Sequence, residues 1–526
     1  MGCPWVPAEL SPNIARMLWD TAQRMPEYDA IVDRSGVTQY RQLHQMAVAA
    51  ATRLRTRFDL AAGDRVAVLA TRGAESAAAF FGIAGAGGIT VMVNETLRPR
   101  QIEHILQHCD AHALVVERRL LDDLPRALDW EGRVVDLAEL VGASDEVPAG
   151  AEPLPRVGND VAQIIYTSGS TGLPKGVTIT HANLWAGVRA VTSYVGITDR
   201  DRIASLLPFS FDYGFNQLLC AVFSGAALVV ERSPFPQEIV VALRRHGVTV
   251  LPCVPPLWLQ LLAAADFRAS PLPTLRAMTN TGGRVPTDAV RSLRELQPQA
   301  RLFLMYGLTE AFRATYLSPE EVDDFPDSIG RAIPGSEILV LREDGSECDS
   351  NEEGELVQRG PTVAAGYWRD PEMTAKVYRP NPRRPAGAPE SERVVFSGDV
   401  VRRDEGGRLF FVGRRDQLIK TLGYRVSPDE VCDVLYASGE VAEAVVGAEP
   451  HEATTNQIVA YVVLHDAGDV ERLSGFCRRE LPRYMQPASI VPLESIPRTT
   501  SGKFDTAAAR ASARGRQRQN GGNGAR

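Results

Sequence analysis

The segment IIYTSGSTGLPKGV (residues 164–177) carries the most information about this chain. A short apolar run, expected to be a strand, leads into a loop of Ser, Thr and Gly that ends at Lys175. Small residues let backbone N–H groups approach phosphate oxygens, and hydroxyl groups add further donors. The spacing differs from that of a Walker P-loop. A flexible turn without a ligand is the alternative, but such a dense run directly after a strand favours a phosphate-binding loop.

Apolar, β-branched runs alternate with helical patterns through most of the chain. Strands are expected at 65–70, 88–93, 113–117, 162–167, 227–230 and 248–253, with helices between them at 40–57, 100–109 and 237–246. This alternation predicts α/β layers with largely parallel sheets. After about residue 336 the pattern changes to short strands with Gly-rich turns, which indicates a smaller β-rich subdomain.

The pattern predicts three parts. Residues 1–415 form a large N-terminal core that holds the phosphate loop, and residues 416–508 form a small α+β domain with a strand at 457–464 and a helix at 470–481. The remainder, 509–526, has few apolar residues and is expected to be a disordered tail.

Composition excludes several classes of function. The formal net charge of -8 argues against a protein that wraps nucleic acid or lies on an anionic membrane. The seven cysteines are scattered without a CxxC pair, so a reduced, soluble, cytoplasmic protein is expected. His104, His108 and His112 recur at helical spacing without nearby carboxylates or cysteines, which favours a solvated helix face over a metal site.

The motifs resemble, in order, those of the AMP-forming adenylating (ANL) superfamily, which contains acyl-CoA synthetases, peptide-synthetase adenylation domains and luciferases. The phosphate loop resembles the family's signature. The further motifs are MYGLTEA (305–311), GELVQRGPTVAAGYW (354–368), SGDVVRRDEGG (397–407), FVGRRDQLIKTLGYRVSPDEV (411–431) and PRTTSGK (497–503). The resemblance covers nearly the whole chain and implies a large α/β core followed by a small mobile lid domain.

The resemblance implies a use of ATP and Mg²⁺. Thr309 is expected to contact phosphate, Glu310 to hold Mg²⁺, and Lys503 to bridge the attacking carboxylate and ATP. Asp399 is expected to accept the ribose hydroxyls with Arg414 nearby, and Tyr306 to form the adenine slot. The full set of ATP-binding residues that the motifs imply is Thr167, Ser168, Gly169, Ser170, Thr171, Gly172, Lys175, Gly282, Gly283, Tyr306, Gly307, Asp399, Phe411 and Arg414.

The resemblance also implies two working poses. Asp416 matches the hinge about which the small domain rotates between two half-reactions. Gly423 matches the loop that lines the thiol tunnel in the second pose, where a missing side chain lets a thin pantetheine arm pass the backbone.

The acyl pocket is expected around PFSFDYGFNQ (208–217), which resembles the F-D-x-S region of amino-acid adenylation domains. Asp212 matches the Asp that binds the substrate ammonium, although Gly214 replaces the Ser. A buried carboxylate without a partner costs several kcal/mol, so Asp212 argues for a substrate amine. Arg313 lies where such domains line the far end of the pocket, and its guanidinium suits a second carboxylate. The other expected wall residues are Tyr213, Asn216, Cys253, Thr279, Thr281 and Met305.

FDYGFN with YGLTEAFRAT most resembles the stand-alone β-amino-acid–carrier-protein ligases of macrolactam polyketide pathways, of the 3-methylaspartate type. The predicted function is adenylation of 3-methylaspartate or aspartate and transfer to the phosphopantetheine thiol of a stand-alone acyl carrier protein. If Asp212 and Arg313 pair with each other, the alternative is an AMP-forming acyl-CoA synthetase for a carboxylic acid without a charged side group. A third alternative, an inactive module that senses ATP or an acyl-adenylate, is disfavoured because Lys503, Glu310 and Asp399 are all present.

Overall fold

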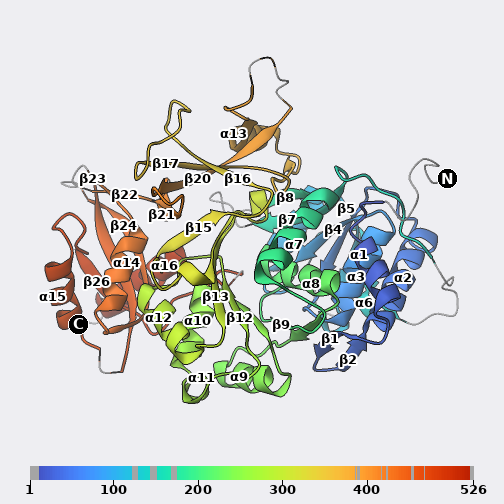
Figure 1. Ribbon diagram of the computed structural model, residues 1–526, viewed down its shortest axis with the longest axis horizontal. Coiled ribbons are helices and arrows are strands. Elements are labelled where there is room, and N and C mark those ends of the chain that lie inside the picture. The colour runs from blue at the N-terminus through green and yellow to red at the C-terminus, as the bar shows by residue number, and fades with distance from the viewer. Residues whose placement is uncertain are drawn as a thin grey trace.

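The computed structural model describes residues 11–120, 128–142, 151–167, 174–385, 387, 391–415, 417–421, 424–451, 455–466, 468–500 and 502–521. Two large sheets with helices packed on them form the N-terminal core, on the right and in the centre of Figure 1. A smaller group of strands and helices from the C-terminal part lies at the left of the same view.

A seven-stranded sheet contains the strand that leads into the phosphate loop. Its order is β18 (Gly366–Tyr367), β8 (Lys175–Thr180), β7 (Val161–Thr167), β4 (Ile89–Val93), β3 (Arg65–Leu69), β5 (Ala111–Val116) and β6 (Arg133–Asp136). The strands from β7 to β6 run parallel, and β8 and β18 add antiparallel pairs at one edge.

A fourteen-stranded sheet carries the rest of the core. Its order is β16 (Glu337–Leu341), β17 (Glu353–Arg359), β20 (Arg393–Arg403), β21 (Leu409–Arg414), β15 (Ser328–Ala332), β14 (Thr315–Leu317), β13 (Arg301–Tyr306), β12 (Ala277–Asn280), β11 (Val250–Cys253), β9 (Arg202–Ser205), β10 (Ala227–Val230), β1 (Asp29–Asp33) and β2 (Gly36–Gln39), with β19 (Tyr378–Pro380) paired to β20. The stretch from β13 to β1 is parallel and the stretch from β13 to β16 is antiparallel. The expected β-rich subdomain is therefore present, but its strands continue the large sheet through the β15–β21 pair.

Helices cover both sheets. Those of the core are α1 (Arg16–Arg24), α2 (Tyr40–Thr56), α3 (Ala74–Gly85), α4 (Pro99–Cys109), α6 (Leu137–Val141), α7 (His181–Val195), α8 (Asp212–Ser224), α9 (Pro236–Arg245), α10 (Pro255–Ala263), α11 (Ala265–Ala269), α12 (Thr287–Leu296) and α13 (Pro371–Val377). Short 3₁₀ turns occur at η2 (Arg118–Leu120), η3 (Thr309–Ala311) and η4 (Pro319–Glu321). The strands and helices predicted from hydrophobic periodicity are confirmed, with boundaries that shift by one or two residues.

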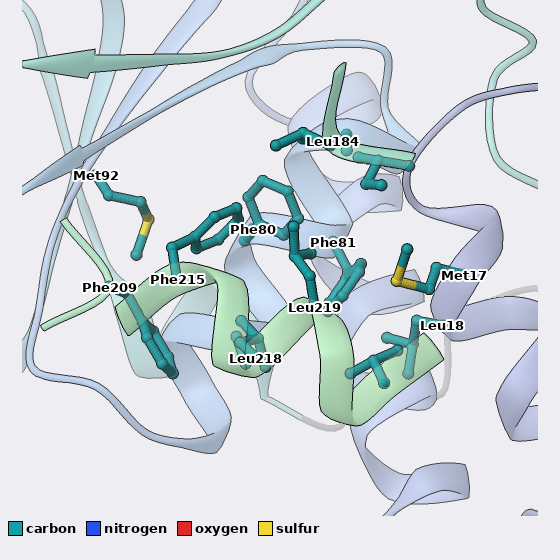
Figure 2. Packing of buried hydrophobic residues seen from close by; sticks show 14 of the residues in the cluster. Met17, Leu18, Phe80, Phe81, Met92, Leu184, Phe209, Phe215, Leu218 and Leu219 are labelled. Carbon is teal, nitrogen blue, oxygen red and sulfur yellow. The ribbon is translucent and has the colours of Figure 1, made fainter. Parts of the chain in front are cut away.

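The main apolar core lies between the two sheets. Helix α3 is buried at every position except Glu75, and α8 packs on it (Figure 2). The rings of Phe80 and Phe215 meet edge to face with centroids 4.6 Å apart. Phe215, Leu218 and Leu219 of α8 are fully buried in this cluster, so they fix the axis of a helix whose first residue is Asp212.

The C-terminal part forms a compact unit of its own. A hairpin of β22 (Ile419–Thr421) and β23 (Tyr424–Val426) precedes a three-stranded sheet of β24 (Val441–His451), β25 (Thr455–Leu464) and β26 (Ser489–Pro492). Helices α14 (Pro428–Ala437) and α15 (Val470–Glu480) cover one face, where they meet Val446 and Ile458. The domain boundary between residues 415 and 416 stays a prediction.

The predicted disordered tail is wrong up to Gly521, because α16 (Thr506–Gly521) occupies this segment. Ala509 and Ala513, one turn apart, are buried against Val445 and Tyr461 on the second face of the C-terminal sheet. Alanines are strong helix formers and their small side chains pack closely on a sheet, so the low apolar content did not reveal the contact. Among the described residues, no helix is long and apolar enough to cross a membrane.

Candidate active site

Lys503 reaches the N-terminal core from the loop that precedes α16. Its Cε lies 3.1 Å from the position that a Cβ on Gly282 would take, and its Nζ is 5.6 Å from the centroid of the Phe211 ring. Gly282 has a φ of 83°, so both its conformation and the space beside it favour glycine. The Asn94 side chain donates a hydrogen bond of 2.9 Å to the carbonyl of Thr500 and ties this loop to the core.

Lys503 lies among the charged residues that the sequence predicts for the site. Burial lowers its pKa, while the negative charges of Asp212, Asp399 and Glu310 raise it. The structure therefore brings the predicted catalytic lysine to the predicted phosphate and acyl-binding residues.

Tyr306 and Asp399 form one side of the site. The Tyr306 hydroxyl donates a hydrogen bond to Asp399 Oδ2, and the Arg414 Nε lies 3.6 Å from Oδ1 of the same carboxylate. Strands β20 and β21 pair Asp399 with Arg414 directly, which explains how two distant motifs meet. Burial raises the pKa of Tyr306 well above its usual value, and the Asp399 charge adds to the effect. The Phe411 ring lies 6.2 Å from that of Tyr306.

The Gly282–Gly283 backbone, predicted for the adenine slot, follows β12. Asn280 donates a hydrogen bond of 3.0 Å to the Gly283 carbonyl, and a Cβ on Gly283 would lie 3.2 Å from Pro255. At Gly307 a Cβ would lie 3.6 Å from the Cα of Arg313. A side chain at Gly283 would therefore press against Pro255.

Glu310 is held by strands from another part of the chain. Its Oε1 accepts a hydrogen bond of 2.6 Å from the Tyr367 hydroxyl, and its carbonyl accepts one of 2.9 Å from the Ala364 N–H. The second carboxylate oxygen has no hydrogen-bond partner in the described part of the chain, so it is available to a cation. An oxygen ligand of this kind fits Mg²⁺.

The described residues hold only the ends of the phosphate loop. Thr167 and Lys175 pair with each other across the antiparallel β7–β8 ladder, so the two ends of the loop lie side by side. The predicted ligands Ser168, Gly169, Ser170, Thr171 and Gly172 lie outside the described residues, as do the predicted hinge Asp416 and the predicted tunnel residue Gly423.

The expectation of a solvated face at His104 and His108 is wrong. His104 Nε2 lies 3.0 Å from the Pro174 carbonyl, and His108 Nδ1 lies 2.7 Å from the Tyr166 hydroxyl. Both histidines line a cavity of about 170 Å³ together with Lys175. They support the two ends of the phosphate loop, a role that spacing along one helix cannot reveal. The described residues contain no cluster of His, Cys, Asp and Glu suited to a metal ion.

Asp212 and Arg313, which the sequence predicts for the acyl pocket, lie side by side, and both are almost fully buried, with 6% and 2% of their surfaces exposed. Arg313 Nη1 is 3.8 Å from Asp212 Oδ2, too far for a hydrogen bond. The guanidinium instead donates to two carbonyls, that of Phe312 at 2.6 Å and that of Asp212 at 3.3 Å. Thr309 donates to Asp212 Oδ2 at 3.4 Å, which links the two halves of the site.

The other predicted wall residues have different surroundings. The Tyr213 hydroxyl bonds to the Thr279 hydroxyl at 2.6 Å and to its carbonyl at 2.9 Å, so this ring supports the wall of the pocket. The Arg313 guanidinium lies 5.3 Å from the centroid of the Tyr213 ring. Cys253 and Thr281 are buried at the ends of neighbouring strands β11 and β12.

Sequence reasoning missed Tyr194 and Cys220. The Tyr194 hydroxyl donates to Met305 Sδ at 2.9 Å, and its ring stacks on that of Tyr316 with centroids 4.1 Å apart. No motif marks Tyr194. Cys220 lies two turns after Asp212 on α8, and this i, i+4, i+8 spacing through Asn216 is a signal that could have found it.

Two buried donors in this pocket have no hydrogen-bond partner among the described residues, Nε of Arg313 and Nδ2 of Asn216. Both residues neighbour Asp212, because Arg313 Nη1 is 3.8 Å from Asp212 Oδ2 and Asn216 lies one turn after Asp212 on α8. The Cys220 thiol donates to Asn216 Oδ1 at 3.4 Å. Burial raises the pKa of Cys220 to about 12, so the thiol is neutral. Buried donors are almost always paired in folded proteins, so this pair indicates a place for an acceptor on a ligand.

Comparison with known proteins identifies the family. Residues 18–368 match the family model for AMP-binding enzymes, and residues 430–503 match the model for the C-terminal domain of these enzymes. The chain belongs to the AMP-binding enzyme family. The ANL fold predicted from its motifs is confirmed, and an ATP site with Mg²⁺ is a property of this family.

Relatives include both peptide synthetases and free-standing ligases. The chain is 31% identical to bacitracin synthase 1 of Bacillus licheniformis over 92% of its length, but it spans only 9% of that protein. It is 29% identical to the L-proline–[L-prolyl-carrier protein] ligase of Pseudomonas fluorescens, with 93% of this chain and 97% of that protein covered.

Solved structures share the whole architecture. An o-succinylbenzoate–CoA synthetase from Bacillus subtilis, solved with its acyl-adenylate intermediate, aligns with a TM-score of 0.81 at 26% identity, over 93% of this chain and 96% of that one. The same synthetase has been solved with ATP and magnesium. An anthranilate–CoA ligase aligns with a TM-score of 0.86 at 22% identity, over 97% of this chain and 99% of that one, which shows the fold alone.

Proposed function

We propose that this enzyme adenylates an acidic β-amino acid, 3-methylaspartate or aspartate, and loads it on the phosphopantetheine thiol of a stand-alone acyl carrier protein. The observation that carries the proposal is the pair of buried, unpaired donors on Arg313 and Asn216, next to the carboxylate of Asp212. A donor pair suits a carboxylate, and the adjacent Asp212 suits an ammonium group.

The chemistry of aspartate explains why these residues are neighbours. When the carboxylate β to the amine is activated, the amine and the spare carboxylate are attached to the same carbon. Their protein partners must therefore lie within a few ångströms of each other, as Asp212 and Arg313 do at 3.8 Å. Asp212 binds the amine, and Arg313 with Asn216 binds the spare carboxylate.

The first half-reaction joins two anions. A carboxylate oxygen attacks the α-phosphorus of ATP, the new O–P bond forms, and the bond to the β-phosphate breaks as pyrophosphate leaves. Lys503 offsets the negative charge that gathers between the carboxylate and the phosphate, since it already lies near Asp212, Asp399 and Glu310. Glu310 would hold Mg²⁺, which would neutralise further charge on the phosphates.

The second half-reaction transfers the acyl group. The sulfur of the thiol attacks the acyl carbon, its proton passes to solvent, and the C–O bond to AMP breaks. The carrier-protein ligase that matches this chain almost end to end supports a carrier protein as the acceptor.

An acyl-CoA synthetase for an uncharged acid is the second candidate. The closeness of Asp212 and Arg313 favours it, because two opposite charges at 3.8 Å partly compensate each other without a ligand. The aligned CoA ligases favour it as well.

ATP–pyrophosphate exchange tests the proposal with a panel of acids: 3-methylaspartate, aspartate, β-alanine, 3-aminobutyrate, an α-amino acid and a medium-chain fatty acid. We expect exchange with the acidic β-amino acids above all others. Fast exchange with the fatty acid would establish the second candidate. Thiol-dependent release of AMP, measured with a holo carrier protein and with CoA, then identifies the acceptor.

A further inference from the structure

The backbone reverses sharply between the two halves of the active site. Phe312 has φ 54° and ψ −43°, and the N–H of Arg313 donates to the carbonyl of Ala311 at 2.5 Å. This is a γ-turn with positive φ, a rare and strained conformation for a residue with a side chain. Strain of this kind persists only where surrounding contacts enforce it.

The side chain of Phe312 is one such contact. It is completely buried, and its Cδ1 lies 2.4 Å from where a Cβ on Gly187 would stand. Helix α7 therefore provides a hollow at Gly187 that accepts the ring. Any larger residue at position 187 would displace the ring and release the turn.

Gln358 is the second contact. This fully buried residue of β17 donates from Nε2 to the Arg313 carbonyl at 2.6 Å and to the Thr362 hydroxyl at 3.0 Å. Thr362 donates to the same Arg313 carbonyl at 3.3 Å. The loop that carries Thr362 is fixed in turn by Asn183, which donates to the carbonyls of Pro361 and Val363.

The reversal determines where the guanidinium of Arg313 lies. Nη1 donates to the carbonyl of Phe312, the central residue of the turn, and only the reversed backbone points this carbonyl toward the guanidinium. Nη1 and Nη2 each donate to one carbonyl and keep a second N–H, and Nε has no hydrogen-bond partner among the described residues.

We propose that Gln358 is a positioning residue for Arg313, and that it acts by holding the γ-turn whose ring occupies the Gly187 hollow. Gln358 touches no substrate. It sets the preference for substrates with a second carboxylate, and this role rests on the proposed function, in which Arg313 binds that carboxylate. Glu310, at the other end of the turn, keeps its own anchors at Tyr367 and Ala364, so loss of Gln358 acts on the acyl side.

The test compares Gln358→Met with a matched control, Gln297→Met. Gln297, at the C-terminal end of α12, is also fully buried and accepts a hydrogen bond from a backbone group, the Leu272 N–H. We expect Gln358→Met to raise the KM for aspartate about tenfold more than the KM for β-alanine, the effect of about one lost hydrogen bond. Gln297→Met should change both values by the same factor.

Gly187→Ala is the second variant, and it should produce the same selective loss because it expels the Phe312 ring. Arg313→Ala is measured alongside. A larger rise in KM for aspartate than for β-alanine, in both Arg313→Ala and Gln358→Met, supports the inference. Selective loss in Arg313→Ala with equal losses for both substrates in Gln358→Met overturns the inference alone. Equal losses for both substrates in Arg313→Ala overturn the proposed function and the inference with it.

Discussion

The nucleotide side and the acyl side of the active site meet at residues 309–313 but are built differently. On the nucleotide side Tyr306 pairs with Asp399 and one oxygen of Glu310 with Tyr367, while the acceptors Asn280 Oδ1 and the second oxygen of Glu310 have no hydrogen-bond partner among the described residues. On the acyl side Arg313 and Asn216 keep buried donors without partners among the described residues. Acceptors suit the cation and the nucleotide, which are the same for every acid, whereas unpaired buried donors on the acyl side penalise every substrate that lacks the matching acceptor. Variants on the nucleotide side should therefore affect all acids equally, and variants on the acyl side should affect acidic ones selectively.

Lys503→Ala should have the largest effect. Removal of the charge that stabilises the transition state is expected to slow exchange about 10²–10³-fold for every acid, with the melting temperature unchanged. Exchange rates for aspartate and β-alanine, with circular dichroism as the control for folding, measure this. Normal exchange in the variant would show that Lys503 has no part in adenylation.

Asp399→Ala should come next, because it removes the partner of Tyr306 and the expected ribose contact together. We expect the KM for ATP to rise about tenfold to a hundredfold while the ratio of KM values for aspartate and β-alanine stays constant. Tyr306→Phe is the matched control, since it removes only the hydroxyl. A changed acid preference in Asp399→Ala would break the separation between the two sides.

Asn216 offers a charge test on the acyl side. Asn216→Ala should weaken the binding of aspartate about tenfold relative to that of 3-aminobutyrate, since one donor to the spare carboxylate is lost. Asn216→Asp should weaken it further, because a carboxylate would then face a carboxylate. If Asn216→Asp binds aspartate as tightly as Asn216→Ala does, Asn216 does not face the spare carboxylate.

The interface between the core and the C-terminal unit should give the smallest effect. Arg284 pairs with Asp433 of α14 at 2.5 Å, with Asp429, Glu430 and Asp327 nearby. Burial raises the pKa of Asp433 to about 6 although Arg284 lowers it. The folded state therefore binds the proton of the Asp433 carboxyl more tightly than the unfolded state does. The stability that this proton contributes below about pH 4 is lost as pH rises through 6.

Asp433→Asn should accordingly raise the unfolding free energy at pH 7.5 by about 1 kcal/mol and leave it unchanged near pH 4. Arg284→Ala is the opposite control and should destabilise the protein at pH 7.5, because it leaves buried carboxylates uncompensated. Chemical denaturation at the two pH values measures both. A destabilised Asp433→Asn variant at pH 7.5 would show instead that the ion pair with Arg284 outweighs the cost of burying the carboxylate.

The sequence predicted the nucleotide side better than the acyl side. Tyr306, Asp399 and Lys503 stand in motifs whose order alone indicates that they meet, and the structure brings them together. Tyr194 and Gln358 stand in no motif position with an expected role, since their roles depend on contacts with Met305 and Arg313 that only the folded chain creates. The γ-turn at Phe312 was equally hidden, because Gly187, which makes room for it, lies 125 residues earlier by sequence number.

The central claim is that Arg313 binds a second carboxylate of the substrate, and a matched pair of substrates tests this claim most directly. Aspartate and 3-aminobutyrate differ only in a carboxylate or a methyl group on the carbon that bears the amine. Exchange is measured for both with the wild type and Arg313→Ala. We predict that the wild type prefers aspartate and that Arg313→Ala loses this preference by about tenfold to a hundredfold while 3-aminobutyrate is nearly unaffected. An equal loss for the two substrates would contradict the account and show that Arg313 only supports the pocket.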